Sequence, residues 1–169
     1  KKGRFFMLQQ LKNIFSKKTI EQVHSPVEGE AVSIRDVSDP TFGEEILGKG
    51  IAIKPAKGRV VSPVDGTVTV LIESNHAVSI LSDSGAEILV HVGLDTIKLK
   101  GQHFTAHVKV GDQVKAGDLL LEFDPDAIQK AGYDTIVPIV ILNSNDYTAI
   151  ELCGGGMVRE QDVLMRLEK

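Results

Sequence analysis

The sequence has 169 residues, of which 42% are hydrophobic and 25% charged, a length that suits one domain rather than two. The net charge is −4, but the first eighteen residues carry six Lys or Arg and no acid, which leaves 13 basic and 23 acidic residues in the rest. The excess of acidic residues after residue 18 argues against nucleic acid as a partner. The single cysteine, Cys153, excludes an internal disulfide and suits a reducing cytoplasm.

The segment KKGRFFMLQQLKNIFSKK, residues 1–18, differs in character from everything after it. Its apolar residues recur at helical spacing among lysines, a pattern typical of a short helix lying on an anionic membrane surface. Polar residues interrupt the apolar ones and no small-residue cleavage site follows, so it is not a signal peptide. We expect residues 1–18 to be a basic amphipathic or disordered leader, with peripheral contact at the inner face of the membrane as one role.

From residue 19 onward, short and alternating apolar runs predict β-strands separated by turns rich in Gly, Pro and Asp. Two breaks, near residues 42–47 and 125–130, are expected to be short helical turns. Many short strands at turn spacing predict an all-β fold, an antiparallel β-sandwich, for residues 19–169. The predicted strands are residues 30–34, 50–55, 59–64, 66–72, 76–81, 87–92, 103–110, 118–123 and 136–142.

An internal repeat adds detail to this fold. VHSPVEGEAVSI, residues 23–34, resembles VVSPVDGTVTVL, residues 60–71, and VKVGDQVKAGDLLLEF, residues 108–123, contains two tight Gly-Asp turns. Repeated hairpins of this kind occur in the barrel-sandwich hybrid folds, which include lipoyl and biotinyl carriers. The sequence therefore predicts duplicated hairpins within the sandwich.

Two histidines stand on predicted strands. His91 lies in ILVHVGLDT and His76 in ESNHAVSI. Alternation places His76 on one strand face with Ser74, and His91 on one face with Leu89 and Gly93. If the strands pair as antiparallel neighbours across the SDSGAE turn, the two rings lie opposite or nearly so, whereas a slip of one residue would separate them. The alternative for either ring is a core histidine held by a backbone carbonyl.

The histidine motifs, GAEILVHVGLDTIKLKG and ESNHAVSI, resemble the enzyme IIA component of the glucose-type phosphoenolpyruvate-dependent sugar phosphotransferase system. The resemblance continues through GEEILGKGIAIKP, VSPVDGTV and VKVGDQVKAGDLLLEFD, so it covers nearly all of residues 19–169. It implies that His91 accepts a phosphoryl group from phospho-HPr and donates it to the Cys of a sugar-specific enzyme IIB. Because the sequence holds no IIB, IIC or HPr segment, we expect a free-standing IIA protein, or an excised domain, in the cytoplasm.

The resemblance also implies roles for the neighbours of His91. His76 is the hydrogen-bond donor beside the phosphoryl group, and Ser74, where relatives often have Thr, orients His76. Gly93 supplies the backbone carbonyl that fixes the His91 tautomer. Asp95 borders the phosphoryl site or is a turn residue. An apolar docking patch for the partner proteins is also expected, although each of its members could instead be core: Phe42, Ile46, Leu47, Ile72, Leu89 and Ile97.

Parts of the sequence also resemble three other classes of protein. His91 and Asp95 have the H-x-x-x-D spacing of lysostaphin-like zinc peptidases, but no later H-x-H follows. A biotin or lipoyl carrier needs a modified Lys at a hairpin tip, flanked as M-K-M or D-K-A, which is absent here. A purely regulatory IIA relative would also be phosphorylated on His91, so the sequence does not separate it from a transporter component. No cofactor is expected. Zinc is expected to bind at His76 and His91 only where a partner protein completes the site.

Overall fold

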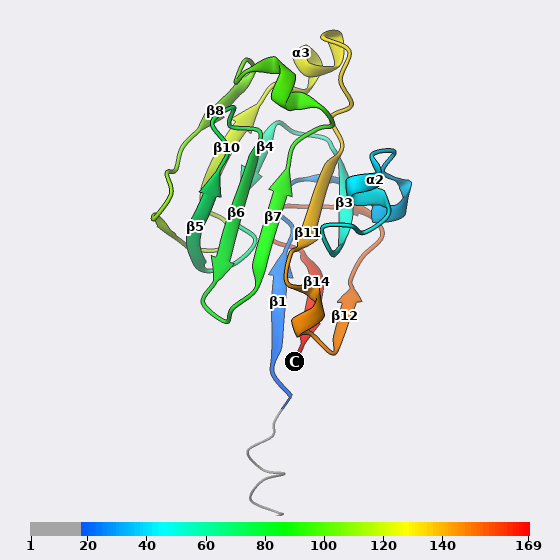
Figure 1. The fold of residues 1–169 in the computed structure, drawn as a ribbon, viewed down its shortest axis with the longest axis vertical. Helices are drawn as coiled ribbons and strands as arrows, with labels where there is room; N and C mark the ends of the chain where they lie inside the picture. The colour runs from blue at the N-terminus through cyan, green and yellow to red at the C-terminus, as the bar shows by residue number, and fades with distance from the viewer. Residues whose placement is uncertain (1–17) are drawn as a thin grey trace, which may run out of the picture.

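The computed structural model describes residues 18–169, so residues 1–17 of the predicted leader lie outside the described residues. Figure 1 shows a fold built almost entirely of strands, with short helices at its margins. Among residues 18–169, no helix is long and apolar enough to cross a membrane. The strands are β1 (Ile20–His24), β2 (Gly29–Ser33), β3 (Lys49–Pro55), β4 (Arg59–Val61), β5 (Gly66–Leu71), β6 (Ala77–Ser82), β7 (Glu87–His91), β8 (Phe104–Ala106), β9 (Gln113–Val114), β10 (Leu119–Phe123), β11 (Val137–Ile141), β12 (Ala149–Leu152), β13 (Gly156–Val158) and β14 (Val163–Glu168).

The strands form three sheets, and every strand pair is antiparallel. The largest sheet has eight strands in the order β13-β2-β3-β11-β7-β6-β5-β9, and two three-stranded sheets have the orders β1-β14-β12 and β4-β10-β8. This confirms the predicted all-β antiparallel class. Each predicted strand overlaps an observed one to within a residue or two at its start, but the predicted strand list does not include β1, β9, β12, β13 or β14.

The helices are short, and the first lies earlier than predicted. Helix α2 is Pro40–Gly43 rather than residues 42–47, because the Asp39 side chain accepts a hydrogen bond from the Thr41 N–H at 3.0 Å and Pro40 occupies the first turn. Helix α3 is Pro125–Lys130, as predicted. Three 3-10 turns, η1 (Ile34–Asp36), η2 (Thr96–Leu99) and η3 (Ser144–Asp146), complete the elements.

The repeated Ser-Pro-Val segments make matching hydrogen bonds. The Ser25 hydroxyl donates to the Val27 carbonyl at 2.8 Å, and the Ser62 hydroxyl donates to the Val64 carbonyl at 2.6 Å. The two copies also bond to each other, since the His24 N–H donates to the Pro63 carbonyl and the Val61 N–H to the Pro26 carbonyl, both at 2.9 Å. The predicted internal repeat is therefore a structural duplication about a shared centre.

The duplication extends to the C-terminus, which the sequence did not reveal. The Gly117 N–H donates to the Ser62 carbonyl at 2.8 Å, and the Gln161 N–H donates to the Ser25 carbonyl at 3.0 Å. The turns share their backbone form, with φ of 94° at Gly117 and 77° at Gln161. This conformation favours glycine, and the β9–β10 turn has a glycine there. The β13–β14 turn has a glutamine instead, so it lacks the glycine that marks such a turn in a sequence.

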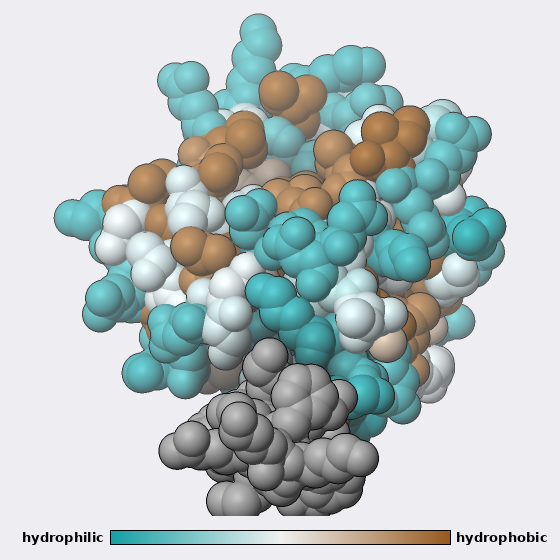
Figure 2. Space-filling model, turned by 60° about the horizontal axis from the view of Figure 1, so that its bottom comes forward, coloured by the Kyte–Doolittle hydropathy of each residue, from teal (hydrophilic) through white to brown (hydrophobic). Residues whose placement is uncertain are grey.

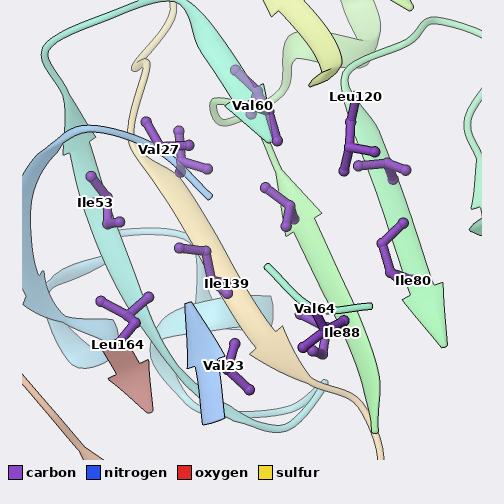
Figure 3. Close-up of a cluster of buried hydrophobic side chains, with 14 of the residues drawn as sticks. Val23, Val27, Ile53, Val60, Val64, Ile80, Ile88, Leu120, Ile139 and Leu164 are labelled. Carbon is purple, nitrogen blue, oxygen red and sulfur yellow. The ribbon is translucent and has the colours of Figure 1, made fainter. Parts of the chain in front are cut away.

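Two clusters of buried side chains lie on opposite faces of the eight-stranded sheet. The main core fills the space between the sheets, and Figure 3 shows side chains of β1, β3, β6, β7, β11 and β14 converging there, Ile139 among them. Ala52 and Val140, which alternate with main-core residues on β3 and β11, belong instead to a second cluster with Phe42 of α2. The eight-stranded sheet is thus covered on its second face near α2.

Ile139, fully buried on β11, gives a direct test of the main core. We expect Ile139→Ala to lower the free energy of unfolding by about 2–5 kcal/mol, because it removes buried methyl groups and leaves a cavity. Leu152→Ala on β12, where the side chain is 51% exposed, is the matched control and should change stability by less than about 0.5 kcal/mol. Urea denaturation measures both, and equal losses would contradict this assignment of the core.

Candidate active site

The two predicted histidines meet where β6 begins and β7 ends, at the upper end of the sheet in Figure 1. Strand β6 pairs with β7 so that Ala77 lies opposite His91, and the Val92 N–H donates to the His76 carbonyl at 2.7 Å. The His76 and His91 ring centroids are 4.8 Å apart, and the rings are nearly perpendicular. The structure therefore brings the predicted pair into contact.

The way in which they meet differs from the prediction. In a regular strand, His76 would point to the face opposite His91, because its neighbour Ala77 pairs with His91. Residues 72–76 are not strand but the turn between β5 and β6, closed by a hydrogen bond from the Asn75 N–H to the Ile72 carbonyl at 2.7 Å. Asn75 has a φ of 58°, so alternation does not govern His76 or Ser74.

His76 is held on one side by Ser74 and on another by an aromatic ring. The Ser74 hydroxyl lies 2.6 Å from His76 Nδ1, within hydrogen-bond distance, and His76 is only 4% exposed. The Phe104 ring of β8 lies edge-on to it, with centroids 6.4 Å apart. Burial lowers the pKa of His76 from its ordinary value, which keeps the ring neutral near pH 7. Nδ1 is committed to Ser74, so Nε2 is the nitrogen left for another partner.

His91 is a half-buried, neutral imidazole whose Nδ1 is sealed from solvent. Burial, and secondarily the proximity of His76, lower its pKa to about 4, while the Gly93 backbone and Asp39 act in the opposite direction. The Phe42 ring packs against it at 5.0 Å between centroids. The Nδ1 atom of His91 is inaccessible to solvent and makes no hydrogen bond that meets the distance and angle limits. The Gly93 backbone is nevertheless close enough to favour the protonated form of the ring.

Gly93 is a position that only glycine fits. Its φ is 79°, and a Cβ there would overlap the Thr96 side chain and the Asp134 carbonyl oxygen. The Gly93 N–H donates to the Ile136 carbonyl at 2.9 Å, so the turn after His91 is tied to the segment before β11. The geometry accounts for a glycine beside the histidine that the sequence motif alone did not explain.

Two carboxylates stand near the site, and the sequence singled out one of them. Asp95 is exposed, has a φ of 58°, and lines an open hollow of about 530 Å³ that Asp39 also lines. Asp39 acts on the charge of His91, but its sequence context marked it only as part of an Asp-Pro turn. Whether Asp95 borders the phosphoryl group stays a prediction.

The predicted docking residues divide into buried and exposed groups. Phe42 is only 4% exposed and Leu89 is half-buried, so both contribute chiefly to the second cluster. Ile46 and Ile97 are 67% and 58% exposed, and Leu47 and Ile72 are exposed as well. Ile72 and Ile97 line one open hollow of about 470 Å³ together with Ser74. The docking role of these six side chains stays a prediction.

The end of the molecule far from the histidine pair, where the described chain begins, has a mostly polar surface. Figure 2 shows the molecule tilted toward the end where the described chain begins, and its surface next to the grey residues is largely hydrophilic. Hydrophobic side chains on this face stand in scattered groups rather than in one continuous patch.

The low pKa of His91 predicts a specific pH dependence. An NMR titration of the His91 ring should show a midpoint at about 4 rather than near 6.5. The unfolded chain binds this proton at its ordinary pKa, so the stabilising contribution of neutral His91 is complete above pH 6.5 and is lost as pH falls toward 4. His91→Gln should flatten the fall of unfolding free energy with pH across that window, and an unchanged slope would contradict the burial of the ring.

Comparisons with known proteins agree with the motif resemblance. A family model described as phosphoenolpyruvate-dependent sugar phosphotransferase system, EIIA 1, matches residues 21–147. The chain is 50% identical over 147 residues to the PTS system beta-glucoside-specific EIIBCA component of Dickeya chrysanthemi, covering 87% of this chain and 23% of that relative. The corresponding component of Bacillus subtilis is 47% identical, again over 87% of this chain and 24% of the relative. The chain thus spans about a quarter of the length of these two relatives.

Two other relatives match over most of their own length. The PTS system glucose-specific EIIA component of Halalkalibacterium halodurans is 39% identical over 150 residues, which cover 89% of this chain and 87% of the relative. The solved structure of glucose permease IIA from Mycoplasma capricolum superposes with a TM-score of 0.79 at 32% identity, covering 90% of this chain and 97% of that one. The chain belongs to the EIIA 1 family of the phosphoenolpyruvate-dependent sugar phosphotransferase system.

Proposed function

We propose that this chain is a phosphohistidine relay in which Nε2 of His91 is the nucleophile. The observation that supports it is the contact of two neutral imidazoles at 4.8 Å, each with its Nδ1 turned into the protein. His91 itself is only half-buried, so Nε2 is the nitrogen through which it meets a partner. A neutral ring is required because a protonated nitrogen has no lone pair to attack phosphorus.

The transfer exchanges one P–N bond for another. The lone pair of His91 Nε2 attacks the phosphorus of the phosphohistidine on HPr, and the P–N bond to HPr breaks, returning its electron pair to the HPr imidazole. In the second transfer, the thiolate of the enzyme IIB Cys attacks the same phosphorus, and the bond to His91 breaks. Such reactions depend on positioning and charge stabilisation, which a rigid pair of rings supplies.

His76 then stabilises the phosphoryl group. If the Ser74 hydroxyl donates to His76 Nδ1, the ring proton resides on Nε2, from which it can donate to a phosphoryl oxygen. A phosphoryl group carries about two negative charges near pH 7, so a nearby N–H is favourable in so dry a site. Ser74 therefore acts through His76 as a positioning residue.

The partners and the location follow from this role. HPr and an enzyme IIB are the donor and acceptor, and we place the protein in the cytoplasm, where those partners act. Some relatives are glucose-specific and others beta-glucoside-specific, and we propose that sugar choice resides in the membrane component rather than in this domain. Membrane contact through residues 1–18 stays a prediction.

We propose that the transfer itself uses no metal ion. No group of three or more His, Cys, Asp or Glu side chains within residues 18–169 is arranged to hold a metal ion. Zinc takes three or four protein ligands, and His76 with His91 supplies two. We propose that zinc would bind here only where a partner contributes a carboxylate.

Phosphorylation by purified enzyme I and HPr with phosphoenolpyruvate tests the nucleophile. Wild-type protein should acquire an acid-labile, base-stable phosphate, and His91→Ala should acquire none. His107→Ala removes an exposed histidine outside the site and is the matched control, expected to label like wild type. Labelling of the His91 variant, with its fold verified by circular dichroism, would reject this residue as the acceptor.

The two transfers should separate in a His76 variant. His76→Ala should still accept phosphate, because His91 remains, but should pass it to enzyme IIB roughly 100-fold more slowly, since one preorganised donor is lost. Rapid-quench measurement of phosphate loss from the labelled protein gives this rate. Onward transfer at the wild-type rate would show that His76 has no part in the reaction.

Ser74 provides a graded version of that test. Ser74→Thr keeps the hydroxyl and should retain onward transfer, whereas Ser74→Ala removes the partner of His76 Nδ1 and should slow transfer by about 10-fold, less than the loss of the ring itself. Equal rates for the two variants would exclude an orienting role for the hydroxyl.

A further inference from the structure

The three peptide groups that follow His91 are each held by a hydrogen bond to another part of the protein. The Val92 N–H donates to the His76 carbonyl at 2.7 Å, the Gly93 N–H to the Ile136 carbonyl at 2.9 Å, and the Leu94 N–H to the Asp134 carbonyl at 3.0 Å. These bonds fix the planes that carry the backbone away from the nucleophile. All three acceptors are backbone carbonyls.

A side chain holds the same segment from the other side. The Thr96 hydroxyl donates to the Val92 carbonyl at 2.6 Å, and Thr96 is fully buried, as is Val92. The peptide between Val92 and Gly93 is therefore bonded at both its carbonyl and its N–H. The Thr96 side chain also occupies the space that a Cβ on Gly93 would need, so the threonine packs directly against the turn.

We propose that Thr96 is a positioning residue for phosphoryl transfer: its hydroxyl fixes the Val92–Gly93 peptide, and through it the position of the Gly93 carbonyl beside the His91 ring. This inference rests on the proposed function and extends it to a residue outside the histidine pair. The Thr96 hydroxyl bonds to the Val92 carbonyl rather than to either ring, so its effect on the rings passes through the backbone.

The consequence of losing the hydroxyl follows from burial. Without Thr96 Oγ1, the Val92 carbonyl loses the hydrogen bond that this hydroxyl donates. Because Val92 is fully buried, water cannot replace that bond, and a buried unpaired carbonyl is unfavourable. The peptide relaxes by rotating, and because Gly93 has wide backbone freedom, the rotation passes to its carbonyl. The Nδ1 proton of His91 then loses its nearby acceptor, and the ring populates the tautomer that places the proton on Nε2, where it blocks attack on phosphorus.

Two substitutions separate this role from packing. Thr96→Val keeps the shape and removes the hydroxyl, whereas Thr96→Ser keeps the hydroxyl and removes the methyl. Thr135→Val, a buried threonine in the facing segment, is the matched control. Nitrogen-15 NMR of the His91 ring reports its tautomer, and rapid-quench phosphorylation over a range of phospho-HPr concentrations separates the maximal rate from the half-saturating concentration.

We expect Thr96→Val to shift the His91 nitrogen signals toward the other tautomer and to slow the maximal rate roughly 10- to 100-fold, with little change in half-saturation. Thr96→Ser should restore both readouts, and Thr135→Val should match wild type. If Thr96→Val lowers stability but leaves tautomer and maximal rate unchanged, the hydroxyl is merely structural and the inference is wrong. A wild-type protein that takes no phosphate from HPr would instead refute the proposed function, while the tautomer measurement would still decide the role of Thr96.

Discussion

The site depends on keeping two imidazole rings uncharged while they lie 4.8 Å apart. A proton on either ring would have to reside in a dry environment, and protons on both would repel each other. Phe42 and Phe104 pack against the pair from two sides, which deepens the burial. Because burial is the leading cause of the low pKa of His91, the same packing that stabilises the fold also provides the free lone pair that the chemistry needs.

The two aromatic neighbours come from different parts of the protein. Phe104 belongs to the main core, between the sheets, and Phe42 to the second cluster, on the other face of the eight-stranded sheet. The histidine pair therefore lies where both clusters reach the end of that sheet. Neither ring can move far without disturbing the packing of one cluster, so the geometry needed for transfer is set by the whole sandwich rather than by a local loop.

The sequence predicted what depends on periodicity and motif, and missed what depends on backbone conformation. Alternation located the core strands, and the motifs singled out His91 and His76, whose rings the fold brings together. The turn at Asn75, which brings His76 beside His91, has no alternation signal because it interrupts a strand. The turn between β13 and β14 was missed because Gln161 adopts a backbone form that usually marks a glycine. Asp39 looked like a turn residue, since only the folded chain places it near His91.

Asp39 has opposite effects on the two forms of the nucleophile. Its negative charge favours the protonated ring, which raises the pKa of His91, and by the same electrostatics it disfavours a phosphoryl group bound there. A relay gains from that second effect, because an acceptor that held phosphate too tightly would not release it to the next partner. In the proposed mechanism, His76 supplies the compensating donor during transfer. The pairing of one stabilising ring with one opposing carboxylate suits a group that must arrive and leave with equal ease.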